Sequence, residues 1–115
     1  MKLYTDKGVT GVGESSLEAR DLEVKGTLEA FRPRIIGLDP SKIEMIWNML
    51  YRSYWSGGAI TMSAISGIEM ALWDITGQAL GAPIWQLLGG KFRAEFPIQL
   101  PATSDCAKIV PKTHG

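Results

Sequence analysis

The segment from Met62 to Arg93 constrains the fold of this 115-residue chain more than any other. Within it, Ile65, Ile68, Leu72 and Ile75 follow one another at spacings of three, four and three residues. This periodicity places them on one face of a helix. The sequence therefore predicts a long helix whose apolar stripe lies in the core.

Small residues and chain breakers set the neighbours and the end of this helix. Gly81 is expected to end it with a positive φ, and Pro83 cannot continue it. A second short helix, Pro83–Leu88, should stop at Gly89–Gly90. Three small residues on the long helix would let other elements approach its backbone closely: Ala64, Gly67 and Ala71.

Ahead of this helix the sequence predicts a β-hairpin. Its strands would be Lys2–Asp6 and Val9–Glu14, joined by a tight turn at Lys7–Gly8. Gly11 and Gly13 weaken the second strand, so we expect another backbone to pack closely against it.

Two helices are predicted between the hairpin and the long helix. Ser15 or Ser16 would cap the first, which would run to about Phe31 and end at Pro33, with Leu22, Leu28 and Phe31 facing inward. Asp39–Pro40 would start the second. Its apolar face would consist of Ile43, Ile46, Trp47, Leu50 and Tyr54. Gly57–Gly58 would end this run, and Ser63 would cap the long helix.

The composition excludes several classes of function. With 45% hydrophobic and 21% charged residues, the chain suits one globular domain. Its 12 basic and 12 acidic residues balance, so we expect no nucleic-acid or anionic-membrane surface. Neither a membrane span nor a signal peptide is expected. The single cysteine, Cys106, excludes an internal disulfide and favours a reducing, cytoplasmic location.

Residues that could carry chemistry are few and scattered. His114 is the one histidine of the sequence, and Cys106 has no histidine beside it. Glu69 and Asp74 are five residues apart, too far around a helix to share a face. We therefore expect neither a metal site nor a catalytic residue in this chain.

Several short motifs, ordered along residues 1–93, together resemble one family. They are GVTGVGE at 8–14, IGLDP at 36–40, SGG at 56–58, ALWD at 71–74 and LLGGK at 87–91. The set resembles the N-terminal capping domain of the enolase superfamily. Within that superfamily it is most similar to the mandelate racemase/muconate lactonizing enzyme group and its acid-sugar dehydratase branch.

The resemblance implies an α+β fold in which a short antiparallel β-meander packs on a bundle of three or four helices. The first strand of the meander would be missing, which leaves one sheet edge bare. In the family this cap covers a (β/α)8 barrel that carries the metal-binding carboxylates and the general bases. Such a barrel needs about 250 residues, so we expect none here. Mg²⁺ is expected only in a full-length homologue, and the chain alone should be inactive.

The resemblance also implies roles for particular residues. Tyr54, Trp55, Ser56 and Gly57 would belong to a loop that covers the substrate. The alternative is that Tyr51 and Tyr54 simply pack on the helices. Asp74 would cap or pair near the barrel contact rather than act as an acid. Three tryptophans are expected in the core: Trp47, Trp73 and Trp85.

We expect residues 1–93 to form the capping domain, and residues 94–115 to be an irregular tail or the start of a truncated barrel. The apolar surface that would face a barrel should drive homo-oligomer formation. A dehydratase parent is expected first, with racemase or cycloisomerase as alternatives. Two other interpretations stay open: a free-standing, self-associating interaction module without an enzymatic role, and a fragment without a role of its own.

Overall fold

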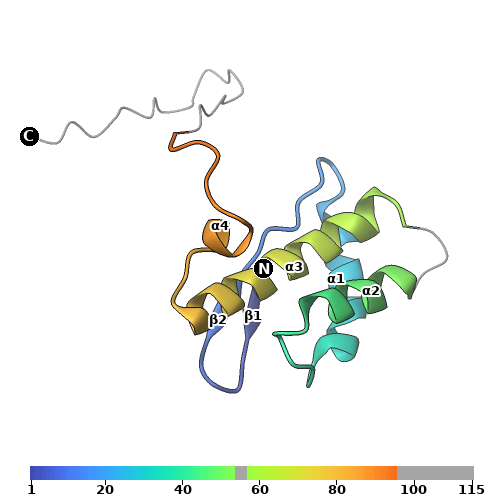
Figure 1. The fold of residues 1–115 in the computed structure, drawn as a ribbon. Coiled ribbons are helices and arrows are strands. Elements are labelled where there is room, and N and C mark those ends of the chain that lie inside the picture. The colour runs from blue at the N-terminus through green and yellow to red at the C-terminus, as the bar shows by residue number, and fades with distance from the viewer. Residues whose placement is uncertain (54–56, 96–115) are drawn as a thin grey trace, which may run out of the picture.

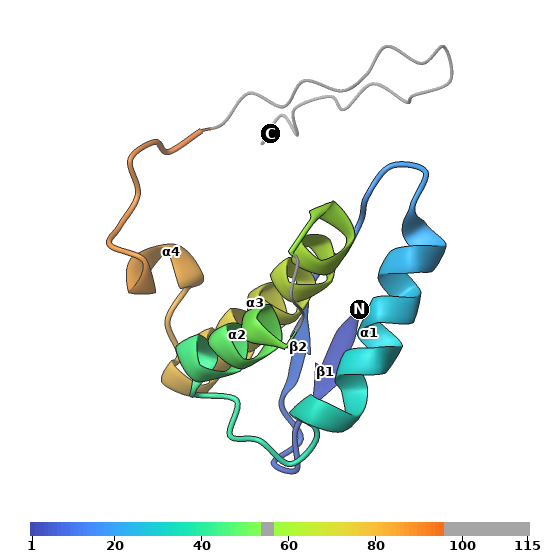
Figure 2. The same ribbon diagram turned by 90° about the vertical axis from the view of Figure 1, so that its right-hand side faces the viewer.

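The computed structural model describes residues 1–53 and 57–95. Its elements are β1 (Lys2–Tyr4), β2 (Thr10–Val12), α1 (Asp21–Ile35), α2 (Ile43–Arg52), α3 (Ala59–Leu80) and α4 (Ile84–Leu87). Helix α3 is central, because it contacts the hairpin, α1, α2 and α4 (Figures 1 and 2). The predicted α+β fold, a small antiparallel sheet packed on helices, is confirmed, and the described residues contain no barrel.

The core lies where α1, α2 and α3 meet. The predicted stripe on α3 is confirmed, since Ile65, Ile68, Leu72 and Ile75 are all buried. Phe31 of α1 and Leu50 of α2 are fully buried as well. The main buried cluster comprises Val24, Phe31, Ile43, Ile46, Leu50, Ala64, Ile65, Ile68 and Leu72.

The hairpin packs directly on the backbone of α3. Its strands are antiparallel, and Gly8 takes a φ of 78° in the turn between them, as predicted. A Cβ atom on Gly11 would overlap the carbonyl oxygen of Ala71, and one on Gly13 would overlap that of Gly67. The close approach predicted from the strand glycines is therefore confirmed, and it explains why side chains are absent there.

The two edges of this sheet differ. In an antiparallel pair, alternate residues turn their N–H and C=O groups away from the partner strand. The register assigns this orientation to Lys2 and Tyr4 on β1, and to Thr10 and Val12 on β2. Side chains of α3 bond to the outward groups of β2. Among the described residues no strand lies beyond β1, so the bare edge of this sheet is the edge of β1.

Helix α1 departs from the prediction at both ends. It begins at Asp21, not after Ser15 or Ser16, and Arg20 precedes it without a side-chain cap. The hydroxyl of Ser15 instead lies over Gly67 of α3, because the segment after β2 must cross that helix first. Pro33 lies inside the last turn and does not end the helix, which continues to Ile35. A proline so near the end removes only one helical hydrogen bond.

The prediction of which α1 residues face inward is also wrong in part. Phe31 is buried and Leu28 is half-buried against the core, as predicted. Leu22, however, is 82% exposed, and Val24 takes the buried position instead. Val24 lies four residues before Leu28 and seven before Phe31, so helical spacing places Val24 on their face and leaves Leu22 off it.

Helices α2 and α3 start at other residues than predicted. Asp39 does not cap α2; its Oδ1 accepts the N–H and the hydroxyl of Ser41 in a separate turn, and α2 begins at Ile43. Helix α3 begins at Ala59 after Gly58, so Ser63 lies within the helix and caps nothing. Its end was predicted correctly, because Gly81 has a φ of 64°.

The tryptophans divide into two groups. Trp47 and Trp73 are half-buried and pack against the core. The prediction for Trp85 is wrong, since its side chain is 44% exposed and Lys91 Nζ lies 4.6 Å from its ring centre. In the described part of the chain, no helix combines the length and apolarity that a membrane crossing requires.

Candidate functional site

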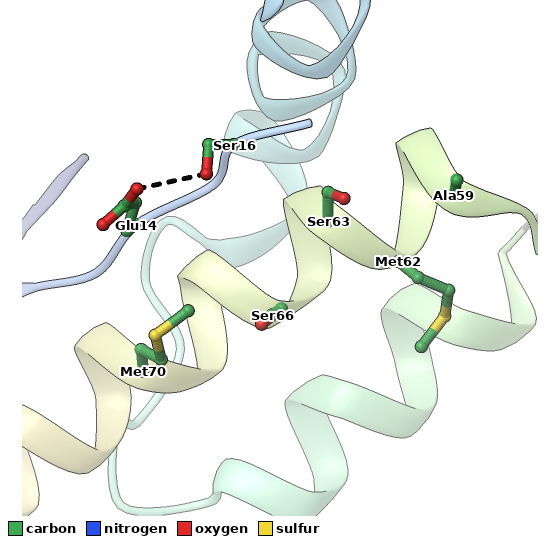
Figure 3. Close-up of a pocket in the computed structure, with 7 residues that line it drawn as sticks. All are labelled: Glu14, Ser16, Ala59, Met62, Ser63, Ser66 and Met70. Atoms are coloured by element: carbon green, nitrogen blue, oxygen red, sulfur yellow. Dashed lines mark hydrogen bonds between the residues drawn. The ribbon is translucent and has the colours of Figure 1, made fainter. Parts of the chain in front are cut away.

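An open groove of about 540 Å³ lies beside the N-terminal half of α3 (Figure 3). Glu14 and Ser16, which follow β2, form one wall of it. The other wall is an outer face of α3, whose lining residues recur at helical spacing: Ala59, Met62, Ser63, Ser66 and Met70.

The groove offers hydrogen-bonding groups on both walls. The Ser16 hydroxyl donates to Glu14 Oε1 at 3.1 Å, and Figure 3 shows this bond between the two side chains. Ser63 and Ser66 add hydroxyl groups from α3, while Met62 and Met70 add apolar surface. A carboxylate with several hydroxyls can bind the hydroxyl groups of a polar ligand. The lining residues include no Lys, Arg or His that could hold an anion.

The described residues do not form a ligand set for Mg²⁺. Residues 1–53 and 57–95 contain no group of three or more His, Cys, Asp or Glu side chains that could hold a metal ion. Glu14 has a hydroxyl, not a second carboxylate, as its hydrogen-bond partner. Oxygen-rich sites for this ion usually combine carboxylates, so no chemical step is assigned to a metal in this part of the chain. Cys106 and His114 lie outside the described residues.

Of the predicted substrate-covering loop, the structure describes Gly57. Gly57 is exposed and precedes Ala59, a lining residue, by two positions. A Cβ on Gly57 would be 3.8 Å from Cε2 of Tyr51. The other three predicted lid residues, Tyr54, Trp55 and Ser56, lie outside the described residues. The lid role stays a prediction, while Tyr51 stacks on Trp47 with ring centres 4.9 Å apart.

Asp74 lies further along α3 and ties this helix to β2. Its Oδ2 accepts the Val12 N–H at 2.8 Å, and its Oδ1 accepts Gln78 Nε2 at 3.1 Å. The same Gln78 amide group donates to the Thr10 carbonyl at 2.8 Å. Asp74 therefore pairs with the sheet, while its expected place near the barrel contact stays a prediction.

The sequence analysis did not identify the groove residues. A signal was present, because small and polar residues recur at spacings of three and four along α3, away from its apolar stripe. Ser63 was instead interpreted as a cap, and Glu14 as the end of a strand. What the sequence could not show is that the segment after β2 crosses this face of α3.

Comparison with known proteins settles the family. Residues 1–89 match the family described as "Mandelate racemase / muconate lactonizing enzyme, N-terminal domain". The chain belongs to this family. Its described fold is that of the family's N-terminal domain, as the resemblance predicted.

Individual relatives are dehydratases and other enolase-superfamily members. The chain is 48% identical to D-galactonate dehydratase of Variovorax paradoxus over 94 residues, which cover 81% of this chain and 25% of that protein. It is 46% identical to D-galactonate dehydratase family member RspA of Halomonas elongata over 105 residues, which cover 90% of this chain and 26% of that protein. A solved enolase structure from Pantoea ananatis, with bound D-gluconate and Mg, has a TM-score of 0.75 and 40% identity over 80% of this chain and 23% of that one. This chain thus spans about a quarter of the length of the relatives it matches.

Proposed function

We propose that this chain is the capping domain of an acid-sugar dehydratase, active only together with a (β/α)8 barrel. The observation that carries the proposal is its 48% identity to a D-galactonate dehydratase along a stretch that makes up 25% of that enzyme. The remaining three quarters would supply the barrel, with its acid–base groups and its Mg²⁺. The chain by itself is then expected to turn over no acid sugar.

Within such an enzyme the cap would bind and enclose the substrate. Glu14, Ser16, Ser63 and Ser66 present hydrogen-bonding groups in one groove, and a sugar acid carries several hydroxyl groups that pair with them. The loop Tyr54–Gly57, as the family resemblance implies, would exclude water from the reaction. Dehydration removes the proton α to the carboxylate and then the neighbouring hydroxyl; both transfers belong to barrel residues in this proposal.

Racemase and cycloisomerase remain the alternatives for the parent enzyme, because a cap alone does not fix the reaction. The relatives favour dehydration, since two of them are a D-galactonate dehydratase and a member of that dehydratase family. The free-standing interaction module finds no support in these comparisons. Homo-oligomer formation by the isolated chain, through the surface that a barrel would cover, is part of the proposal.

A chimera tests this function directly. Residues 1–93 would replace the matching part of the Variovorax paradoxus D-galactonate dehydratase, with the rest of that enzyme unchanged. We expect Mg²⁺-dependent release of water from D-galactonate by the chimera, and none by the isolated chain. A panel containing D-gluconate and galactarate would then define its substrate preference.

A second chimera controls for folding. It carries Gly11→Ala, which replaces no groove-lining residue but should disturb the packing of β2 on α3 and thereby the groove wall that follows β2. A folded first chimera with no activity toward any acid sugar of the panel would contradict the proposal, as would turnover by the isolated chain. Activity in the first chimera that falls in the second supports a cap that works through its own fold.

A further inference from the structure

Side chains of α3 take the place of a neighbouring strand along the outer edge of β2. The outward N–H of Val12 and the outward C=O of Thr10 would pair with another strand in a larger sheet. Here Asp74 Oδ2 accepts the first at 2.8 Å, and Gln78 Nε2 donates to the second at 2.8 Å. A further bond of 3.1 Å joins Asp74 and Gln78, which lie one helical turn apart.

This attachment fixes β2 at a very short distance from α3. Gly11 and Gly13 leave no space between the strand and the carbonyl oxygens of Ala71 and Gly67. Backbone contact with α3 therefore fixes one face of the strand, and the side chains of Asp74 and Gln78 fix its outer edge. Its position on the helix has little freedom.

The groove wall follows immediately after this fixed strand. Only Gly13, which is buried on α3, separates Val12 from Glu14. Glu14 accepts the Ser16 hydroxyl, so the two wall residues are coupled to each other as well as to β2. A displacement of β2 on α3 would move both away from Ser66 and Met70 on the opposite wall.

We propose that Asp74 and Gln78 are positioning residues, which latch β2 onto α3 and thereby set the Glu14 wall of the groove. The two do not line the groove themselves. The relevance of the groove to a substrate rests on the proposed function; the latch itself can be tested without it.

The test uses the full chain and four variants, of which Gln78→Ala removes the second latch residue. Asp74→Ala removes the acceptor of the Val12 amide. Asp74→Asn keeps one carbonyl oxygen for that amide, but its NH2 group replaces the oxygen that accepts from Gln78, so it should restore the Val12 bond and lose the Gln78 bond. Thr76→Val is the matched control, because Thr76 lies on the same helix between the two latch residues and donates only to the Leu72 carbonyl at 3.0 Å.

Amide hydrogen exchange and chemical shifts measured by NMR supply the readout. In Asp74→Ala the Val12 amide should exchange roughly tenfold faster, as expected for one lost hydrogen bond. The Glu14 and Ser16 amide resonances should shift as well. Thr76→Val should leave Val12 exchange and both resonances close to those of the parent chain. Asp74→Asn should keep Val12 exchange close to the parent value and shift Glu14 and Ser16 only in part, through the lost Gln78 bond. Gln78→Ala should reproduce the Glu14 and Ser16 shifts in part.

Two results would overturn the proposal. One is unchanged Val12 exchange in Asp74→Ala. The other is faster exchange without a change at Glu14 and Ser16, which would make the contact merely structural. In the chimera, Asp74→Ala should raise the KM for the acid sugar, whereas Thr76→Val should not. An inactive chimera would contradict the proposed function but leave the exchange results on the isolated chain standing.

Discussion

Gly11 lies directly against the carbonyl oxygen of Ala71, so strand β2 and helix α3 touch through their backbones. A methyl group at this position has no space, and either the strand or the helix must move to admit it. We expect Gly11→Ala to lower the free energy of unfolding by about 1–3 kcal/mol, the usual cost of overpacking. Urea unfolding followed by circular dichroism measures it.

Gly26→Ala is the control for that substitution. Gly26 lies inside α1, and a Cβ there meets no atom within 4 Å. Alanine should therefore raise the stability by about 0.5–1 kcal/mol, because it restricts the unfolded chain and favours the helix. Equal effects of the two substitutions would contradict the close packing of β2 on α3.

The core between α1, α2 and α3 gives a second prediction. Leu50 has 0% exposure, so Leu50→Ala leaves a cavity and should cost about 2–5 kcal/mol of stability. Leu22 is 82% exposed, and Leu22→Ala should change stability by less than about 0.5 kcal/mol. A large loss at Leu22 would mean that α1 starts nearer to Ser15, as the sequence alone suggested.

The turn before α2 makes stability depend on pH. The Ser41 backbone N–H and the Ser41 hydroxyl both donate to Asp39. These bonds, of which the backbone one has the larger effect, hold the pKa of that carboxyl below its usual value. The folded pKa therefore lies below the unfolded one of about 3.9. The stability that the ionised Asp39 carboxylate gives to the folded chain is complete above the unfolded pKa, and it is lost as the pH falls through the folded pKa.

An NMR titration of the Asp39 carboxyl checks this sign. Ser41→Ala should raise the Asp39 pKa only part of the way, because the backbone donor remains. Ser16→Ala, which removes a hydroxyl near Glu14 instead, should leave the Asp39 pKa unchanged. An Asp39 pKa at or above the usual aspartate value in the parent chain would show that this turn does not form.

Association of the isolated chain is the fourth prediction. Val12 is 55% and Met70 is 42% exposed. Val12 lies on the face of the sheet opposite to Gly11 and Gly13, which pack on α3, and Met70 lies in the groove wall of α3. We expect light scattering to show oligomers of the isolated chain, and the combined substitution Val12→Lys and Met70→Lys to reduce their mass. Leu22→Lys, which adds one lysine on the exposed side of α1, should not. A monomer at high concentration would argue against self-association.

Much of the fold could be predicted because it depends on local periodicity. The stripe of α3, the φ of Gly81 and the close packing of Gly11 and Gly13 were all inferred from spacing or residue type. Helix starts were harder. Asp39 and Ser63 are chemically suited to cap a helix, but which residue begins a helix depends on tertiary contacts that sequence patterns do not contain.

The candidate site was less predictable than the fold. The groove brings Glu14 and Ser16 next to residues of α3 that lie about fifty positions later in the sequence. Such a pairing needs the path of the chain between β2 and α1. Ser15 fixes that path by contact with Gly67, and a serine before a predicted helix suggests a cap instead.

Because the outward backbone groups of β2 are bonded to side chains of α3, another strand can extend this sheet at the edge of β1. With Asp74 and Gln78 on one side, the outward backbone groups that the described part of this sheet offers to a further strand are those of Lys2 and Tyr4. A lysine at such an edge discourages unspecific pairing between molecules. In the described part of the domain, a further strand can pair with the edge of β1, where the charge of Lys2 opposes unspecific partners. A design that adds a third strand to this sheet should therefore target β1.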